Sequence, residues 1–265
     1  MGEWLRSGAC PCRRLETMAK LNGKVAVVTG ASKGIGAAIA RALAADGASV
    51  VVNYASSKAG ADAVVEAITS SGGKAIAVQG DVSKLADAQA LIQAAVERFG
   101  RLDVLVNNSG IYEFASIEDV TEDHYRRQFD VNVLGILLAT QAASPHLGEG
   151  ASIINISSAI THVNTPGAAA YAGTKGAVNA ISGVHANELA PRKIRVNVVS
   201  PGLVVTEGTH AAGVIGSEME TGLIAQTPLG RVGQPDDIAD VVTFLASDDA
   251  RWLTGENITA SGGIR

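Results

Sequence analysis

Short runs of β-branched residues alternate with longer alanine-rich segments over most of the chain. The run at residues 24–29 (KVAVVT) is continuously apolar, which is typical of a strand buried on both faces of a parallel sheet. Residues 34–46 have the composition of a helix, and Gly47 supplies a common helix stop. The same alternation predicts further strands at residues 49–54, 74–79, 103–106, 152–156, 195–199 and 257–260, and further helices at residues 59–71, 84–99, 121–143, 169–189 and 235–246.

Strands that alternate with helices of this length pair in parallel, because each helix carries the chain back to the same edge of the sheet. Right-handed crossovers then place helices on both faces and give a doubly wound α/β sheet of about seven strands. No linker, repeat or charge run divides residues 21–265, which we expect to form one domain. Residues 1–20 differ in composition and lack an apolar core segment, so we expect a disordered N-terminal extension there.

Composition and charge exclude several classes of function. The net charge is −5, whereas a nucleic-acid-binding protein needs a basic patch or stripe. No run of about 18 or more apolar residues is present, so we expect no membrane span and a cytoplasmic location. Cys10 and Cys12 are the only cysteines, and without a second pair they predict neither a disulfide framework nor a metal site.

Glycines cluster where the first predicted strand turns into the first predicted helix. Residues 29–36 read TGASKGIG. Glycines at such a junction allow a tight turn and let a phosphate group approach the unpaired N–H groups that begin the helix. No Gly-Lys-Ser/Thr follows, so the spacing is not that of a P-loop. A purely structural glycine-rich turn is the alternative, and the strand–turn–helix context favours a dinucleotide site.

Tyr171 and Lys175 lie four residues apart at the start of a predicted helix. Residues with this spacing share one helix face, so we expect the ammonium to lie beside the phenol and to lower its pKa from about 10. Ser157 and Ser158 directly follow a predicted strand, and open α/β sheets bind ligands at the carboxyl ends of their strands. A solvated Tyr–Lys pair and serines that merely end a strand are the alternatives for each motif taken alone.

These motifs occur in a fixed order with two others. Residues 107–110 (NNSG) and residues 201–202 (Pro-Gly) each follow a predicted strand. Together with the glycine turn, Ser158 and the Tyr171–Lys175 pair, they resemble the short-chain dehydrogenase/reductase family in its single-domain form. The chain is similar to the 3-oxoacyl-acyl-carrier-protein reductases and carbonyl reductases of that family. The resemblance extends from about residue 21 to residue 263 and implies a Rossmann-type fold.

The resemblance implies a catalytic role for four residues. Tyr171 is the expected acid/base, and Ser158 is expected to hold the substrate oxygen by a hydrogen bond. Lys175 is expected to lower the pKa of Tyr171 and to bind the nicotinamide ribose. Asn132, within the predicted helix at residues 121–143, matches the family's fourth catalytic residue, which helps to hold a proton-relay water. An asparagine that bonds only to backbone is the alternative.

The resemblance also implies contacts with the dinucleotide. Asp81 matches an adenine-contacting aspartate, and Asn107 matches a residue that steadies the central sheet. The family usually carries Ala where this chain has Ser109, a departure that affects local packing, and it often has an aspartate before the paired glycines near the end, where this chain has none. The expected cofactor-binding residues are Gly30, Ser32, Lys33, Gly34, Ile35, Gly36, Asn53, Ser56, Asp81, Val82, Asn108, Gly110, Tyr171, Lys175, Pro201 and Gly202.

The residues after the second predicted strand favour NADP(H). An NAD-dependent enzyme typically places a carboxylate there for the adenosine ribose hydroxyls, and residues 53–58 (NYASSK) contain none. Lys33 provides a cation where the extra phosphate of NADP(H) is expected, and Ser56 and Ser57 provide donors. A solvated loop lysine is the alternative for Lys33, and the absence of Arg at Ala55 leaves use of NAD(H) open.

The function that follows is the reversible, NADPH-dependent reduction of a ketone to a secondary alcohol. A 3-oxoacyl thioester, a small or bulky free ketone, and a sugar or other alcohol are all compatible substrates. Acyl-carrier-protein substrates require a basic patch, for which Arg126-Arg127 and Arg192-Lys193 are candidates. A catalytically silent dinucleotide sensor and a nucleotide-sugar epimerase are the alternatives. The intact catalytic set disfavours the first, and the spacing of the glycine turn disfavours the second.

Two further expectations concern the pocket and the assembly. Residues 203–227 have a length suited to a mobile lid, and with Tyr112, Phe114, Ile160 and His162 they are expected to shape the pocket. The predicted helix at residues 169–189 is rich in Ala and Gly and is apolar on more than one face. We therefore expect pairing about two-fold axes and a homotetramer, which the resemblance also implies.

Overall fold

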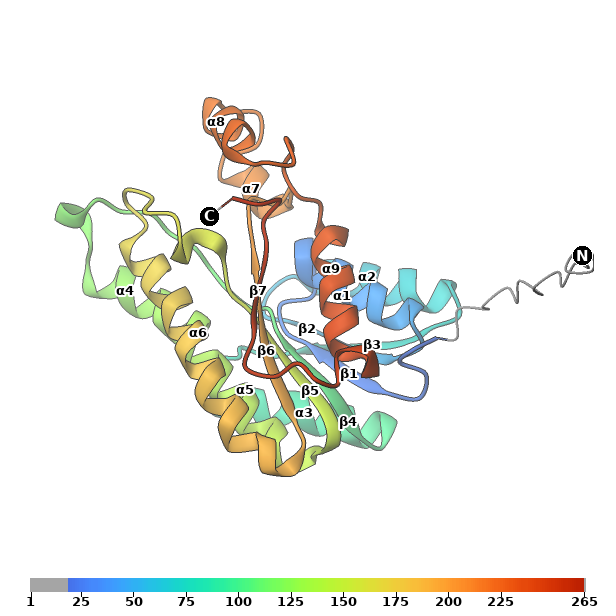
Figure 1. Cartoon of the computed structure of the whole chain (residues 1–265). Coiled ribbons are helices and arrows are strands. Elements are labelled where there is room, and N and C mark those ends of the chain that lie inside the picture. The colour runs from blue at the N-terminus through green and yellow to red at the C-terminus, as the bar shows by residue number, and fades with distance from the viewer. Residues whose placement is uncertain (1–18, 265) are drawn as a thin grey trace, which may run out of the picture.

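The computed structural model describes residues 19–264, in which seven strands form one sheet with helices on both faces (Figure 1). The strands are β1 (Val25–Val28), β2 (Ser49–Tyr54), β3 (Lys74–Gln79), β4 (Leu102–Asn107), β5 (Leu147–Ile156), β6 (Arg195–Pro201) and β7 (Asn257–Ala260). The α-helices are α1 (Gly34–Ala45), α2 (Lys58–Ser70), α3 (Leu85–Phe99), α4 (Glu122–Phe129), α5 (Gly135–Ala143), α6 (Ala169–Leu189), α7 (Glu207–Ala211), α8 (Glu218–Gln226) and α9 (Pro235–Ala246). The expected N-terminal extension lies outside the described residues except for its end, where Lys20 pairs with Asp249 at 2.6 Å.

All strand pairs are parallel, and their order across the sheet is β3-β2-β1-β4-β5-β6-β7. This order confirms the expected doubly wound α/β fold. The chain changes direction across the sheet between β1 and β4, which are neighbours although two strands separate them in sequence. The segments that follow β1 and β4 leave toward opposite faces, so a crevice opens at the carboxyl ends of the central strands.

The sheet separates two aliphatic cores. One core packs α1, α2 and α9 against one face and includes Ile39, Val64 and Leu245. The other core packs α3, α5 and α6 against the opposite face and includes Leu91 and Ile153. The central strands are buried throughout, which explains their continuous apolar sequence.

Three elements differ from the sequence-based expectation. The single helix expected at residues 121–143 is interrupted by a five-residue π-helical segment, Asp130–Leu134, between α4 and α5. Strand β5 begins at Leu147 instead of Ser152, and its pairing with β4 shifts register between Leu102 and Val104. The expected lid at residues 203–227 contains two short helices, α7 and α8, which lie above the carboxyl ends of the strands (Figure 1).

A chain of buried amides ties the central strands to the helices. The side-chain amide of Asn107 on β4 donates to Asn155 Oδ1 on β5 at 2.8 Å. Asn155 Nδ2 in turn donates to the hydroxyl of Ser182 on α6 at 2.8 Å, and Ser182 donates to the Val178 carbonyl. Each of these side chains is at least nine-tenths buried, so each bond replaces water that folding removed. These hydrogen bonds fix α6 against the sheet.

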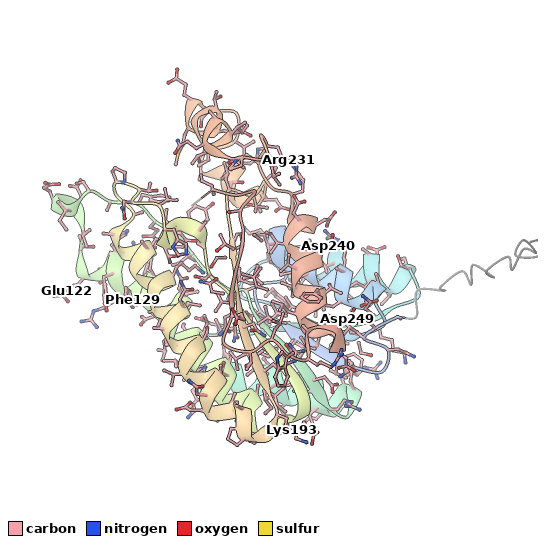
Figure 2. All side chains as sticks on the ribbon, viewed as in Figure 1. Glu122, Phe129, Lys193, Arg231, Asp240 and Asp249 are labelled. Atoms are coloured by element: carbon pink, nitrogen blue, oxygen red, sulfur yellow. The ribbon has the colours of Figure 1, made fainter. Side chains whose placement is uncertain are left out.

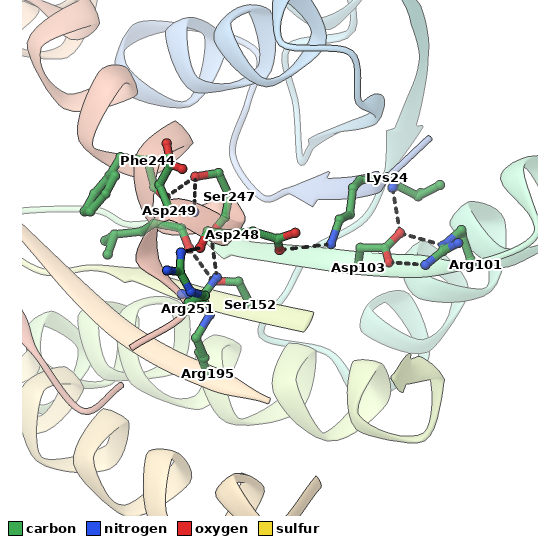
Figure 3. A network of polar contacts seen from close by, with 12 residues as sticks. Lys24, Arg101, Asp103, Ser152, Arg195, Phe244, Ser247, Asp248, Asp249 and Arg251 are labelled. Carbon is green, nitrogen blue, oxygen red and sulfur yellow. Dashed lines mark hydrogen bonds and ion pairs between the residues drawn. The ribbon is translucent and has the colours of Figure 1, made fainter. Parts of the chain in front are cut away.

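A second polar network lies near the amino ends of the central strands, away from the crevice (Figure 3). Asp103 at the start of β4 accepts from the Val25 backbone N–H and from the Arg101 guanidinium. Arg195 and Ser152 donate to backbone carbonyls at the end of α9.

Within residues 19–264, no helix has both the length and the apolar character needed to cross a membrane.

Candidate active site

A cleft of about 540 Å³ opens at the carboxyl ends of the central strands. Ser158, Tyr171 and Lys175 line it, together with every residue that we expected to bind the cofactor except Asn53. The sequence motifs, of which Gly30 and Gly202 are 172 residues apart, therefore meet in one place. The cleft also contains residues that the sequence did not single out, among them Val204, Thr206 and Glu207 from the segment that forms the lid.

The glycine turn between β1 and α1 is held from both sides. The Gly30 N–H donates to Asn53 Oδ1 from β2 at 3.1 Å. Asn108, after β4, donates from its side-chain amide to the carbonyls of Thr29 and Gly30 at 2.9 and 3.1 Å. Gly30 has a φ of +60°, a left-handed conformation that glycine adopts at little cost. Asn53 is buried and supports the turn from behind, and it is absent from the lining of the cleft.

Gly36 leaves no room for a side chain. A Cβ at this position would lie 2.4 Å from Asn108 Nδ2 and 2.5 Å from the Gly30 carbonyl oxygen. The first turn of α1 thus packs directly on the glycine turn. Lys33 at the N-cap makes no capping bond, and the first turn of the helix contains no acidic residue. Backbone N–H groups at this helix start suit a pyrophosphate, so the residues present fit a dinucleotide.

One end of the cleft lies beside β2 and β3. Ala55, Ser56 and Ser57 line the cleft after β2, and none of them is acidic. Lys33 of the glycine turn also lines the cleft. Asp81 follows β3, and hydrogen bonds from the Ser83 side chain and backbone hold the pKa of its carboxyl below the ordinary value. Asp81 is therefore a fixed anion and hydrogen-bond acceptor.

Tyr171 and Lys175 extend from the first turns of α6, and Ser158 follows β5. The Lys175 ammonium is almost fully buried and donates to the Ile156 carbonyl at 2.9 Å. Its Nζ lies 5.8 Å from the centre of the Tyr171 ring. The Ser158 hydroxyl accepts from the Ile160 N–H at 3.2 Å, which leaves the serine proton free to donate. The three side chains thus share one wall of the cleft.

The pKa of Tyr171 differs from the sequence-based expectation. Burial raises it to about 12, and the neighbouring Ser158 hydroxyl opposes this rise. We expected Lys175 to lower this pKa, but at Tyr171 the effect of burial is the largest one. Burial also lowers the pKa of Lys175 to about 8, because the apolar surroundings disfavour its charged form. The phenol is therefore protonated at neutral pH.

Asn132 lies in the π-helical segment and is fully buried. Its side chain accepts from the Ile111 N–H and donates to the Ile111 carbonyl, both at 2.8 Å, and it also donates to the Thr174 hydroxyl at 3.1 Å. A Cβ at Gly110 would lie 3.4 Å from Asn132 Oδ1 and 3.6 Å from Lys175 Nζ. Asn132 therefore fixes the loop after β4 beside Lys175 and does not itself line the cleft.

Thr206 and Glu207 lie at the site but belong to none of the sequence motifs. Thr206 lines the cleft and caps α7, where it forms reciprocal bonds with Thr209. Its position five residues after Pro201, together with the Thr-x-x-Thr spacing of a helix start, was the available signal. A Cβ at Gly34 would lie 3.3 Å from the Thr206 methyl group and 3.6 Å from a Glu207 carboxylate oxygen, so α7 meets the glycine turn across the cleft.

Comparisons with known proteins agree with this geometry. A family model described as enoyl-(acyl carrier protein) reductase matches residues 30–265. An uncharacterized oxidoreductase of Methylorubrum extorquens is 80% identical over 94% of this chain and 100% of its own length. A 3-oxoacyl-[acyl-carrier-protein] reductase of Staphylococcus aureus is 42% identical over 91% of this chain and 98% of its own length.

Solved structures give the same result. A short-chain dehydrogenase from Burkholderia cenocepacia, crystallised in complex with NADP, superposes with a TM-score of 0.88 at 38% identity, covering 92% of this chain and 99% of the other. The family match, the relatives and the shared fold leave one assignment: the chain belongs to the short-chain dehydrogenase/reductase family and is an oxidoreductase.

Proposed function

We propose that the protein reduces a ketone to a secondary alcohol with NADPH, reversibly. The observation that carries the proposal is the meeting of Ser158, Tyr171 and Lys175 with the glycine turn in a single cleft. A dinucleotide sensor without catalytic activity has no need of a phenol and a serine hydroxyl at the end of that cleft. NADPH, when bound, supplies the hydride.

The residues of the chain manage the proton and the orientation of the substrate. Tyr171 keeps its proton at neutral pH and donates it to the carbonyl oxygen as charge develops there. Ser158 has a free hydroxyl proton and holds the same oxygen. Lys175 uses one N–H for the Ile156 carbonyl and has two left for ribose hydroxyls. Asn132 keeps the loop after β4 in place, and it stays our candidate for a proton-relay role.

The charge distribution in the cleft supports NADP(H) over NAD(H). Lys33 lies where the 2′-phosphate of the adenosine is expected, and no carboxylate follows β2. The relative from Burkholderia cenocepacia is a complex with NADP. A charge-assisted contact between Lys33 and this phosphate provides the preference.

A free ketone suits the site better than a substrate on an acyl carrier protein. The basic residues that we considered for a carrier protein are engaged elsewhere: Arg127 pairs with Glu113 at 2.7 Å, Arg126 with Glu122 at 3.4 Å, and Lys193 with Glu149 at 2.6 Å. Lys193 also lies at the end of the molecule opposite the lid (Figure 2).

The segments around the substrate end are acidic or neutral. Residues 111–121, 159–170 and 203–230 contain six acidic residues and no Lys or Arg. The acidic residues are Glu113, Glu118, Asp119, Glu207, Glu218 and Glu220. A phosphorylated or acidic carrier is repelled by such a surface, whereas an uncharged ketone is not.

We also propose a homotetramer and retain the cytoplasmic location as a prediction. Large apolar side chains remain exposed on two separate surfaces. One surface carries Tyr125, Leu134, Leu137 and Val184 on α4 to α6, and the other carries Phe244 and Trp252 on and after α9. Two different two-fold contacts between copies would cover both surfaces and close a tetramer.

Replacement of Tyr171 by Phe tests the reaction. The variant should bind NADPH like the wild type and should reduce ketones about 10²- to 10⁴-fold more slowly, because the general acid is lost and the ring is kept. NADPH absorbance with a panel of ketones gives the rate, and NADPH fluorescence gives the affinity. Tyr125→Phe, the same change on an exposed part of α4, is the control. A Tyr171→Phe variant that keeps a tenth of the activity contradicts the assignment, and a wild type that oxidises NADPH with none of the ketones contradicts the function.

Replacement of Lys33 by Ala tests the cofactor preference. Affinity for NADPH should fall about 10- to 150-fold, the equivalent of about 1.5–3 kcal/mol, while affinity for NADH changes little. Lys74→Ala, at the exposed amino end of β3, should change neither affinity. Titration by fluorescence measures both cofactors. An equal loss for NADPH and NADH would show that Lys33 does not discriminate between them.

The pH dependence of the two directions should be opposite. Lys175, with a pKa of about 8, loses its charge as pH rises through this value, so kcat/KM for ketone reduction should fall above about pH 8. Tyr171, with a pKa of about 12, must be deprotonated for alcohol oxidation, so the initial rate of oxidation should keep rising beyond that pH. Initial rates of reduction and of oxidation, measured from about pH 6 to pH 10, test both expectations. A reduction rate that is flat up to about pH 10 contradicts a role for the Lys175 charge.

Light scattering tests the assembly. At micromolar concentration the particle mass should be four times the 27.0 kDa of one chain. Replacing Leu137 on α5 by Glu should yield a smaller particle, because a buried unpaired charge at a two-fold contact faces its own copy. A wild-type mass of one chain refutes the proposal.

A further inference from the structure

Aromatic side chains are scarce in this chain, yet they gather at the catalytic tyrosine. The sequence has four Tyr, four Phe and two Trp. Three of these ten rings, from Tyr112, Phe114 and Tyr171, surround one point. Their centres lie 6.0 Å apart for Tyr112 and Tyr171, 6.3 Å for Phe114 and Tyr171, and 6.2 Å for Tyr112 and Phe114. All three pairs are tilted or edge-to-face, the arrangement that aromatic rings prefer.

The Tyr112 and Phe114 rings are not part of either hydrophobic core. Tyr112 lines the cleft, and its hydroxyl oxygen would lie 3.0 Å from a Cβ at Gly208 on α7. The ring therefore bridges the catalytic tyrosine and the lid. Phe114 is 49% exposed, a large apolar surface left in water at the mouth of the site. A ligand ring placed beside Tyr171 would cover this surface.

We propose that Tyr112 and Phe114 form an aromatic wall that makes uncharged aryl ketones the preferred substrates. The inference rests on the proposed ketone reduction and specifies its substrate class. A substrate ring next to the reacting carbonyl contacts the edges or faces of both side chains while Tyr171 and Ser158 hold the carbonyl oxygen. Each aromatic contact favours an aryl substrate over a saturated one of equal size by about 2- to 10-fold.

The charge of the surrounding segments supports the uncharged part of the proposal. Glu113 stands between the two wall residues and is paired with Arg127, while Glu207 and Glu220 lie on the lid. Arg127 offsets the charge of Glu113, but a ketone with a carboxylate or phosphate near its ring would still meet the charges of Glu207 and Glu220 on the lid. A neutral aromatic ring meets no such penalty.

Two ketones of equal skeleton test the wall. Phenylacetone and cyclohexylacetone differ only in the saturation of the ring, and neither ring is conjugated with the carbonyl, so their intrinsic reactivities are matched. We expect the wild type to show a kcat/KM about 4- to 100-fold higher for phenylacetone, the product of two aromatic contacts. The rigid pair 2-tetralone and 2-decalone repeats the comparison.

Variants locate the preference in the wall. Tyr112→Leu and Phe114→Leu keep apolar bulk and remove the ring, so each should lower the phenylacetone to cyclohexylacetone ratio of kcat/KM about 2- to 10-fold. Tyr112→Phe keeps the ring and should keep the ratio. Phe244→Leu, the same change at an exposed position on α9, is the matched control.

The outcomes distinguish a failure of the proposed aromatic wall from a failure of the proposed ketone reduction. A wild-type ratio near one, or a Tyr112→Leu variant that loses both activities equally, overturns the aromatic wall and leaves ketone reduction intact. A wild type that reduces no ketone, although it binds NADPH, overturns the proposed function and the wall with it. A preference that Tyr112→Phe keeps and both Leu variants reduce supports the wall.

Discussion

Amide side chains from the strands on either side hold the glycine turn between β1 and α1. The rest of the site depends on these hydrogen bonds. Asn53 from β2 accepts from the Gly30 N–H, and Asn108 after β4 donates to the Thr29 and Gly30 carbonyls. These bonds set the distance between β2, β1 and β4 at the edge where the crevice opens. Because Gly36 packs against the same atoms, the start of α1 is fixed relative to all three strands. A cofactor site built on this turn needs no rearrangement of the backbone to form.

Burial moves the pKa values of Tyr171 and Lys175 apart, upward for the phenol and downward for the ammonium. The same apolar surroundings raise the pKa of Tyr171 to about 12 and lower that of Lys175 to about 8, because each environment disfavours the charged form. At neutral pH the result is a neutral phenol beside a cation that lies close to its titration point. This combination suits a proton donor in reduction, and the Ser158 hydroxyl, which opposes the rise at Tyr171, eases the reverse step.

The sequence was sufficient for the fold and for most of the cleft, for a physical reason. Parallel strands buried on both faces and glycine-ended helices leave strong local patterns, and the motifs stand at strand ends, which parallel pairing brings to one edge. Three features had no local signal. The π-helical turn at Asn132 depends on its bonds to Ile111, which lies 21 residues away. The role of Asn53 depends on the Gly30 N–H, and the pKa of Tyr171 depends on how deeply the whole domain buries it.

The residues that we propose for catalysis and those that we propose for substrate selectivity lie in different parts of the chain. Tyr171, Lys175 and Ser158 stand on α6 and at the end of β5, where the buried bonds among Asn107, Asn155 and Ser182 fix the sheet against the helix. Tyr112, Phe114 and the lid stand on segments outside the two cores, apart from Val204 at the start of the lid. Substitutions in these segments change what fits beside the phenol at little cost to folding, because they leave the buried network intact. A scaffold divided in this way can keep one reaction while its substrate changes, and in our proposal the two rings beside Tyr171 set the substrate of this chain.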